Sequence, residues 1–111
     1  MLKSGIKHSI VSIVAYTPKK RKSKQLYDLL KRHVTVLRKE NLVTKRPSVL
    51  LKSNEGYVEI FEWKSGKSID DAHKNSTVTK MWAKFNVCCE YTPLEKLEEC
   101  KMMFANFKPL N

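Results

Sequence analysis

The stretch that decides the fold is YVEIFEWKSGKSIDDAHKNSTVTKMW, residues 57–82. Its first eight residues, 57–64, are rich in aromatic and β-branched side chains and predict a strand. The segment RPSVLLKS at 46–53 has the same character, and Asn54-Glu55-Gly56 between the two is a turn sequence. We therefore expect a β-hairpin over residues 46–64.

Helix signals follow the hairpin. Ser68 and Asp71 have the spacing of a capping box and predict the start of a short helix. Asn75-Ser76-Thr77 ends that helix and caps another. The predicted apolar face of this next helix consists of Val78, Met81, Trp82, Phe85, Cys88 and Cys89.

The segments on either side complete an alternation of strands and helices. HSIVSIVAY, residues 8–16, predicts a strand, and residues 20–40 predict a long helix. Thr92-Pro93-Leu94-Glu95 predicts the capped start of a further helix, and residues 103–110 predict a closing strand. The buried stripe expected on the long helix comprises Leu26, Leu29, Leu30, His33, Val34 and Leu37.

The order strand, helix, strand, strand, helices, strand is the split β-α-β order of ferredoxin-like domains. We therefore predict an α+β fold with a four-stranded antiparallel sheet. The chain of 111 residues has the length of a single domain, 1–111, with its core over 8–108.

Both faces of the predicted sheet are apolar. A sheet with one solvated face would alternate apolar and polar residues, whereas residues 10–14 and 49–51 do not. The helices of one chain can cover only one face. A second copy is the simplest cover for the other face, so we expect a homodimer that forms a dimeric α/β barrel.

Positive charge is concentrated in the first half of the chain. Residues 1–52 carry a net charge of +12 and residues 53–111 a net charge of −1. Part of the excess lies in KKRKSK, Lys19–Lys24, which is either a solvated helix start or a docking site for an acidic partner. RNA-recognition strands carry basic and stacking side chains where Glu55 and Glu59 stand here, so we expect no sequence-specific nucleic-acid binding.

Composition also limits the location and the chemistry. The longest apolar run, residues 10–16, is too short for a membrane span, and no signal peptide is readable, so we expect a cytoplasmic protein. Cys88, Cys89 and Cys100 lack metal-binding spacing and are expected to be reduced structural thiols. No Gly-rich phosphate loop, nucleophile elbow or metal-binding histidine spacing is present.

The run Glu59–Ser65, followed by Ala72-His73, Asn75 and a helix bearing Trp82, resembles the antibiotic biosynthesis monooxygenase-like family. The resemblance extends over residues 8–108 in element order. The resemblance implies a dimeric α+β barrel. The family is also grouped with stress-responsive barrel proteins, which are similar to it. Members of known function include cofactor-independent oxygenases of quinols or polyketide aromatics, and haem-degrading enzymes.

The haem-degrading members share an Asn on the first strand and a Trp on the helix after the third strand. Residues 8–16 contain no Asn and residues 68–74 contain no Trp. This departure disfavours haem degradation, and we expect no cofactor. What the resemblance then implies is oxygenation of a deprotonated aromatic in an apolar pocket that holds a base.

Two histidines are the candidate catalytic residues. His73 is either a base or a hydrogen-bond donor to a ligand, or a residue that packs at a helix end or dimer seam. His33, on an apolar helical stripe, is either a polar group lining a cavity or a core histidine with its hydrogen bonds satisfied.

Aromatic residues are the candidate ligand-binding residues. Trp63 and Trp82 could form walls that stack a planar phenol or quinol, and they could equally be plain core. Tyr91 and Phe85 are grouped with them. Glu59 and Glu62 point to opposite sheet faces, so one is expected to be interior with a partner such as Arg46 or a lysine.

Three functions follow from these residues. The first is a cofactor-independent monooxygenase acting on a small aromatic or quinol-type substrate. The second is a barrel that binds a small hydrophobic or aromatic molecule without chemistry. The third is a barrel whose basic segment, Lys19–Lys24, docks on an acidic partner.

Overall fold

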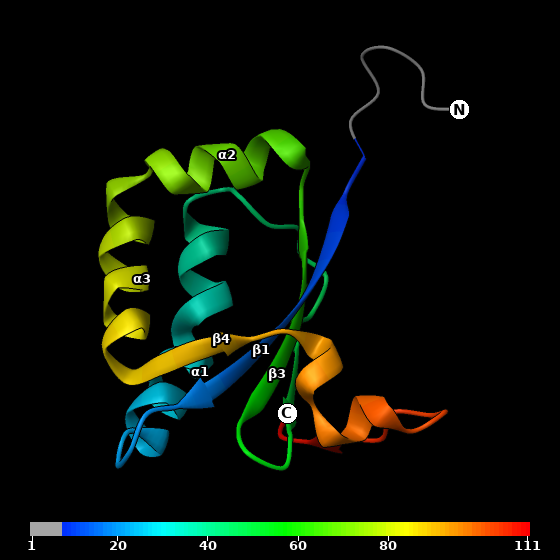
Figure 1. The fold of residues 1–111 in the computed structure, drawn as a ribbon. Coiled ribbons are helices and arrows are strands. Elements are labelled where there is room, and N and C mark those ends of the chain that lie inside the picture. Colours follow the sequence, from blue (N-terminus) through cyan, green and yellow to red (C-terminus); the bar gives the residue numbers. More distant parts are fainter. Residues whose placement is uncertain (1–7) are drawn as a thin grey trace.

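A computed structural model describes residues 8–111 of the chain (Figure 1). It contains a five-stranded antiparallel sheet in the order β4-β1-β3-β2-β5 and three α-helices. The strands are β1 (Ile10–Pro18), β2 (Val49–Lys52), β3 (Tyr57–Trp63), β4 (Cys89–Thr92) and β5 (Lys108–Pro109). The helices are α1 (Ser23–Lys39), α2 (Gly66–Lys74) and α3 (Ser76–Cys88). The predicted α+β class is confirmed, and the sheet has five strands rather than four.

The predicted hairpin is confirmed. β2 pairs with β3 in antiparallel register, with Lys52 opposite Tyr57, and β3 pairs with β1 along its whole length. Gly56 lies in the connecting turn, where an added Cβ would come within 1.9 Å of the carbonyl oxygen of Tyr16. Only glycine fits this close approach of two backbones, which fixes where the hairpin turns against β1.

The helix stripe predicted for residues 20–40 is confirmed within the shorter helix α1. Its buried residues are Leu26, Leu29, Leu30, His33, Val34 and Leu37. The helix begins only at Ser23, after Arg21 adopts a positive φ of 65°. The basic segment Lys19–Lys24 is therefore mostly a turn between β1 and α1, and only its last two residues, Ser23 and Lys24, belong to the start of the helix.

The caps of α2 and α3 follow the sequence in one case and differ in the other. The Asn75 side chain accepts a hydrogen bond from the Val78 amide at 3.0 Å, which confirms the predicted cap of α3. The predicted capping box at Ser68 is wrong, because α2 begins earlier. Ser65 is its N-cap and accepts from the Ser68 amide, and Ser68 is buried inside the helix.

The C-terminal third differs most from the sequence prediction. Residues 89–92 were expected to continue a helix and cap another, and instead form β4 on the free edge of β1. Pro93 follows in an extended conformation, and two short 3₁₀ helices (Leu94–Lys96 and Glu98–Lys101) replace the predicted α-helix. The unpaired edge of β1 offers backbone hydrogen bonds that outweigh the local helix signal of Thr92 and Glu95.

The predicted closing strand at 103–110 is also shorter. Only Lys108–Pro109 pair, and they pair with β2 at the opposite edge from β4. β4 holds the edge of the sheet beside β1. The fifth strand is therefore an addition at the other edge.

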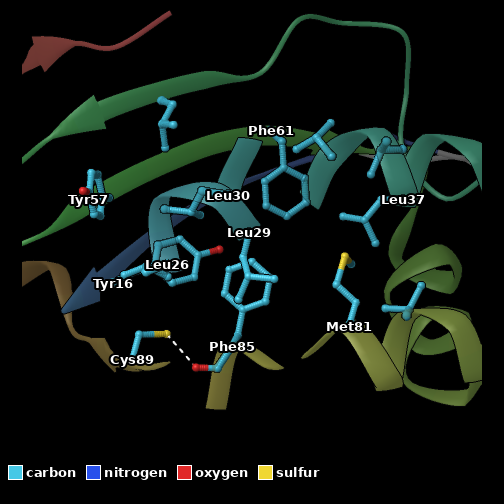
Figure 2. Packing of buried hydrophobic residues seen from close by; sticks show 14 of the residues in the cluster. Tyr16, Leu26, Leu29, Leu30, Leu37, Tyr57, Phe61, Met81, Phe85 and Cys89 are labelled. Carbon is cyan, nitrogen blue, oxygen red and sulfur yellow. Dashed lines mark hydrogen bonds between the residues drawn. The ribbon is translucent and has the colours of Figure 1, made fainter. Parts of the chain in front are cut away.

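The main core lies between the sheet and the three helices, which all pack on one side of it (Figure 1). α1 and α3 pack against each other, and their buried side chains share one core cluster with those of β1 and β3. In Figure 2, aromatic rings from β1, β3 and α3 meet the leucines of α1, and the Cys89 thiol donates to the Phe85 carbonyl oxygen at 3.1 Å. The helical face of the sheet is thus a packed interior.

The second face of the sheet is covered only in part. Leu97, Cys100 and Phe107, in the segment after β4, pack against Ala15 and Val58. The apolar side chains that stay exposed in this half of the molecule include Val11, Ile13, Val49, Met102, Met103 and Phe104, of which Met103 is 93% exposed. The chain therefore supplies part of the cover that the sequence assigned to a second copy.

The helices of residues 8–111 are short or polar for a membrane span. None of them combines the length and the apolar character that crossing a bilayer requires.

Candidate functional site

A cavity of about 390 Å³ lies on the helical side of the sheet. β1, β3 and β4 supply one side, and α1, α2 and α3 supply the other. Its lining residues are Ser12, Val14, Tyr16, His33, Phe61, Trp63, Ile69, His73, Trp82, Phe85, Asn86 and Tyr91.

All six candidate residues from the sequence line this one cavity. They are His33 from α1, Trp63 from β3, His73 from α2, Trp82 and Phe85 from α3, and Tyr91 from β4. Trp63 and Phe85 are buried, whereas His73 and Tyr91 reach solvent. The fold therefore brings together side chains that are up to 58 positions apart in sequence.

A chain of hydrogen bonds runs from the cavity into the core. The Trp82 indole Nε1 donates to His33 Nε2 at 3.0 Å. His33 Nδ1 lies 2.8 Å from Glu59 Oε1, and the Tyr16 hydroxyl donates to the same carboxylate oxygen at 2.8 Å. Trp82, His33 and Tyr16 line the cavity, whereas Glu59 is 2% exposed and lies behind them.

These contacts fix the tautomer of His33. An indole N–H can only donate, so His33 Nε2 must be the acceptor and carries no proton. The proton of the neutral ring is then on Nδ1, which donates to Glu59. Glu59 Oε1 accepts hydrogen bonds from both His33 and Tyr16. In this arrangement His33 has no lone pair available to a ligand.

The surroundings keep Tyr16 protonated. Burial raises the pKa of its hydroxyl well above the ordinary value, and the nearby Glu59 carboxylate raises it further. The phenol group therefore stays a donor to Glu59. None of the residues that line the cavity is a lysine or arginine. The lining therefore supplies no permanent positive charge to balance Glu59.

The sequence predicted that either Glu59 or Glu62 is interior, and the buried residue is Glu59. Its partners are a histidine and a tyrosine, and the expected Arg46 or lysine is wrong for this position. Arg46 instead pairs with Glu62 on the other face, with Nε 3.1 Å from Oε1. Glu59 shares its face with Tyr57, Phe61 and Trp63, and this aromatic alternation was the signal that could have placed it in the core.

His73 is oriented by its own helix. Its Nδ1 lies 2.8 Å from the Ile69 carbonyl oxygen, one turn earlier in α2, and so carries the proton. Nε2 is left as the acceptor nitrogen, and the ring packs edge-on against Trp82 with centroids 5.1 Å apart. His73 thus lies at the end of α2, which was one of the two positions predicted for it. It also lines the cavity, as a ligand-binding role would require.

The remaining walls are aromatic. Phe85 packs against His33, with ring centroids 5.0 Å apart, and Trp63 donates its indole N–H to Ser12 Oγ at 2.9 Å. Tyr91 stacks obliquely on Tyr16, and burial raises the pKa of its hydroxyl to about 12. The cavity is therefore apolar on most sides, with tyrosine and histidine polar atoms at a few points.

Within residues 8–111, no cluster of three or more His, Cys, Asp or Glu side chains is placed to hold a metal ion. The three cysteines are free thiols, and burial raises the pKa of Cys89 to about 12.

The fold and the cavity define an α+β sheet protein with a histidine- and aromatic-lined cavity under its helices. No family model, curated protein or solved structure that was compared with the chain gave a match.

Proposed function

We propose that the cavity binds a small, planar aromatic molecule with a hydroxyl group, such as a phenol or a quinol. The observation that carries this proposal is that His33, His73 and both tryptophans line one cavity. Its volume of about 390 Å³ lies within the range of ligand sites, roughly 300–1,000 Å³. Indole and phenyl walls favour a flat ring, and the tyrosine and histidine groups can meet its hydroxyl.

Ligand binding is tested with 2-naphthol as the probe. Its addition should quench tryptophan fluorescence and raise the melting temperature, because a ligand at 100 times its Kd stabilises by about 2.7 kcal/mol. Val14→Phe, which fills the cavity from β1, should abolish both effects. Val87→Phe, on α3 but outside this cavity, is the matched control and should retain them. Unchanged binding in Val14→Phe would exclude the cavity.

A second candidate function, cofactor-independent monooxygenation, rests on the two histidines in this apolar lining. Dioxygen is the oxidant: a quinol and dioxygen yield a hydroxyquinone and one water, so no external reductant is needed. Removal of the hydroxyl proton gives the electron-rich anion that reacts with oxygen, and His33 and His73 are the candidate bases. Oxygen uptake with a series of quinols should fall in His33→Ala or His73→Ala. Binding without uptake in any quinol favours the non-catalytic function.

The family and assembly proposals rest on the sequence resemblance and on the second sheet face. We propose a ferredoxin-like, antibiotic biosynthesis monooxygenase-like protein that forms a homodimeric barrel in the cytoplasm. Val11, Ile13 and Val49 remain 40–53% exposed on this half of the molecule, which a second copy would cover. Sedimentation should give a dimer, and Ile13→Lys should give a monomer. A wild-type monomer refutes the barrel and leaves the cavity proposal intact.

The docking hypothesis for Lys19–Lys24 has a narrower basis. Lys24 pairs with Asp28 at 3.0 Å, and Lys19 donates to the Asn86 carbonyl oxygen at 2.8 Å. Part of this segment is therefore already used in local contacts, and we do not propose docking as the function.

A further inference from the structure

We propose that His33, paired with the buried Glu59, is the base that takes the ligand proton once the Trp82 indole has moved off Nε2. This inference rests on the proposed binding of a phenol or quinol, and it identifies which histidine acts. It also gives Glu59 the role of a positioning residue, because Glu59 acts through His33 and does not line the cavity.

The geometry of the pair is that of an oriented base. Glu59 Oε1, 2.8 Å from His33 Nδ1, holds the ring with its proton on the core side. Nε2, the basic nitrogen, consequently points to the cavity side, where Trp82 meets it. A carboxylate behind a histidine stabilises the imidazolium that forms when Nε2 accepts a proton. His73 has a backbone carbonyl oxygen in this place, which orients the ring but carries no full negative charge.

Trp82 is the group that must move. Its side chain is only partly buried, and its indole N–H occupies the single lone pair of His33 Nε2. A phenol hydroxyl that takes this position donates to Nε2 in the same way as the indole did. Exchange of one donor for the other leaves no buried polar atom of His33 without a partner.

The proton transfer then balances within the cavity. The phenol O–H bond breaks, its electron pair stays on oxygen, and its proton goes to His33 Nε2. The products are a phenolate and an imidazolium next to the Glu59 carboxylate. The other titratable groups that face this pair are Tyr16, Tyr91 and His73, and the cavity lining contains no lysine or arginine that would oppose protonation of His33.

The experiment uses p-nitrophenol, whose anion absorbs visible light while the neutral phenol does not. Binding is measured by equilibrium dialysis and ionisation by the absorbance of the bound dye at constant pH. The wild-type protein should bind the dye and raise its anion-to-phenol ratio about tenfold or more above that in solution. Absence of binding contradicts the proposed function, whereas binding with no extra ionisation contradicts only this inference.

Variants separate the roles. Glu59→Gln keeps an oxygen acceptor but removes the charge, and should return the ratio to near that of the free dye. Trp82→Phe removes the indole donor and should keep or increase the ratio. Lys80→Gln, on the solvent side of the same helix, is the control. If His73→Gln abolishes the ionisation and Glu59→Gln leaves it intact, His73 is the base and the inference is wrong.

A measurement on the wild-type protein tests the proposal even if a variant fails to fold. In ¹⁵N spectra of histidine, His33 should show the Nδ1–H tautomer without ligand and the doubly protonated ring with p-nitrophenol. The indole proton of Trp82 should shift at the same time. A His33 ring that stays neutral when the dye is bound overturns the proposal.

Discussion

Removal of the Tyr16 hydroxyl tests the chain of hydrogen bonds that links Tyr16, Glu59 and His33. Tyr16→Phe keeps the ring, which packs on Phe85 at 5.6 Å between centroids, and deletes only the bond to Glu59. Hydrogen bonds to charged groups contribute about 1.5–3 kcal/mol. Glu59 keeps His33 as a donor, so we expect a loss near the middle of that range, about 2 kcal/mol. In a domain of this length the melting temperature should fall by roughly 8 °C.

The assay is urea unfolding, with Tyr27→Phe as the matched control. Tyr27 is a half-buried tyrosine of α1 that stacks on Tyr57, and its hydroxyl has no hydrogen bond to residues 8–111. Its loss should change the free energy of unfolding by less than about 0.5 kcal/mol. In a Glu59→Gln background, Tyr16→Phe should cost about 1 kcal/mol, because the acceptor is neutral. Equal costs for Tyr16→Phe and Tyr27→Phe would refute the charged network.

Three further outcomes follow from single contacts. Gly56→Ala should destabilise by about 3 kcal/mol in urea unfolding, since its Cβ meets backbone at 1.9 Å, whereas Gly66→Ala, with its nearest contact at 3.6 Å, should be tolerated. Equal losses of stability in the two glycine variants would contradict the close approach of Gly56 to the Tyr16 backbone. Phe85→Ala, at a position 1% exposed, should cost about 3–5 kcal/mol by thermal unfolding; a loss under 1 kcal/mol would contradict its packing. Hydroxyl and guanidinium donors lower the pKa of Glu62, so its stabilisation is present above the ordinary glutamate pKa and disappears as pH falls through the lowered value. The stability difference between wild type and Glu62→Gln should therefore vanish in acid, and a constant difference would contradict this linkage.

Local patterns were sufficient where one segment makes its own structure. The stripe of α1 follows from helical spacing, and the hairpin follows from strand composition around a glycine turn. The Asn75 cap follows from a side chain that bonds three residues ahead. Each signal involves residues close in sequence, so the sequence alone specifies it.

The C-terminal third could not be predicted in this way. The segment Thr92–Glu95 carries a good helix-start signal, yet Thr92 pairs with Ala15 and its hydroxyl meets that of Thr17 at 2.6 Å. The competing partner, the edge of β1, is more than 70 residues away in sequence. A local signal worth about 1 kcal/mol does not outweigh a row of backbone hydrogen bonds and a buried Leu97.

The candidate site was also predictable only in part from local sequence patterns. Residue type, helical spacing and the family resemblance made His33, His73, Trp63 and Trp82 candidates for the site, and all four line one cavity. The sequence by itself determined the strands and helices that carry them. Only the tertiary structure decided that Glu59 and Tyr16 stand behind His33, because the strand order places β1, β3 and α1 in contact. Hydrogen bonds between residues 26 to 49 positions apart exist only after those elements have packed.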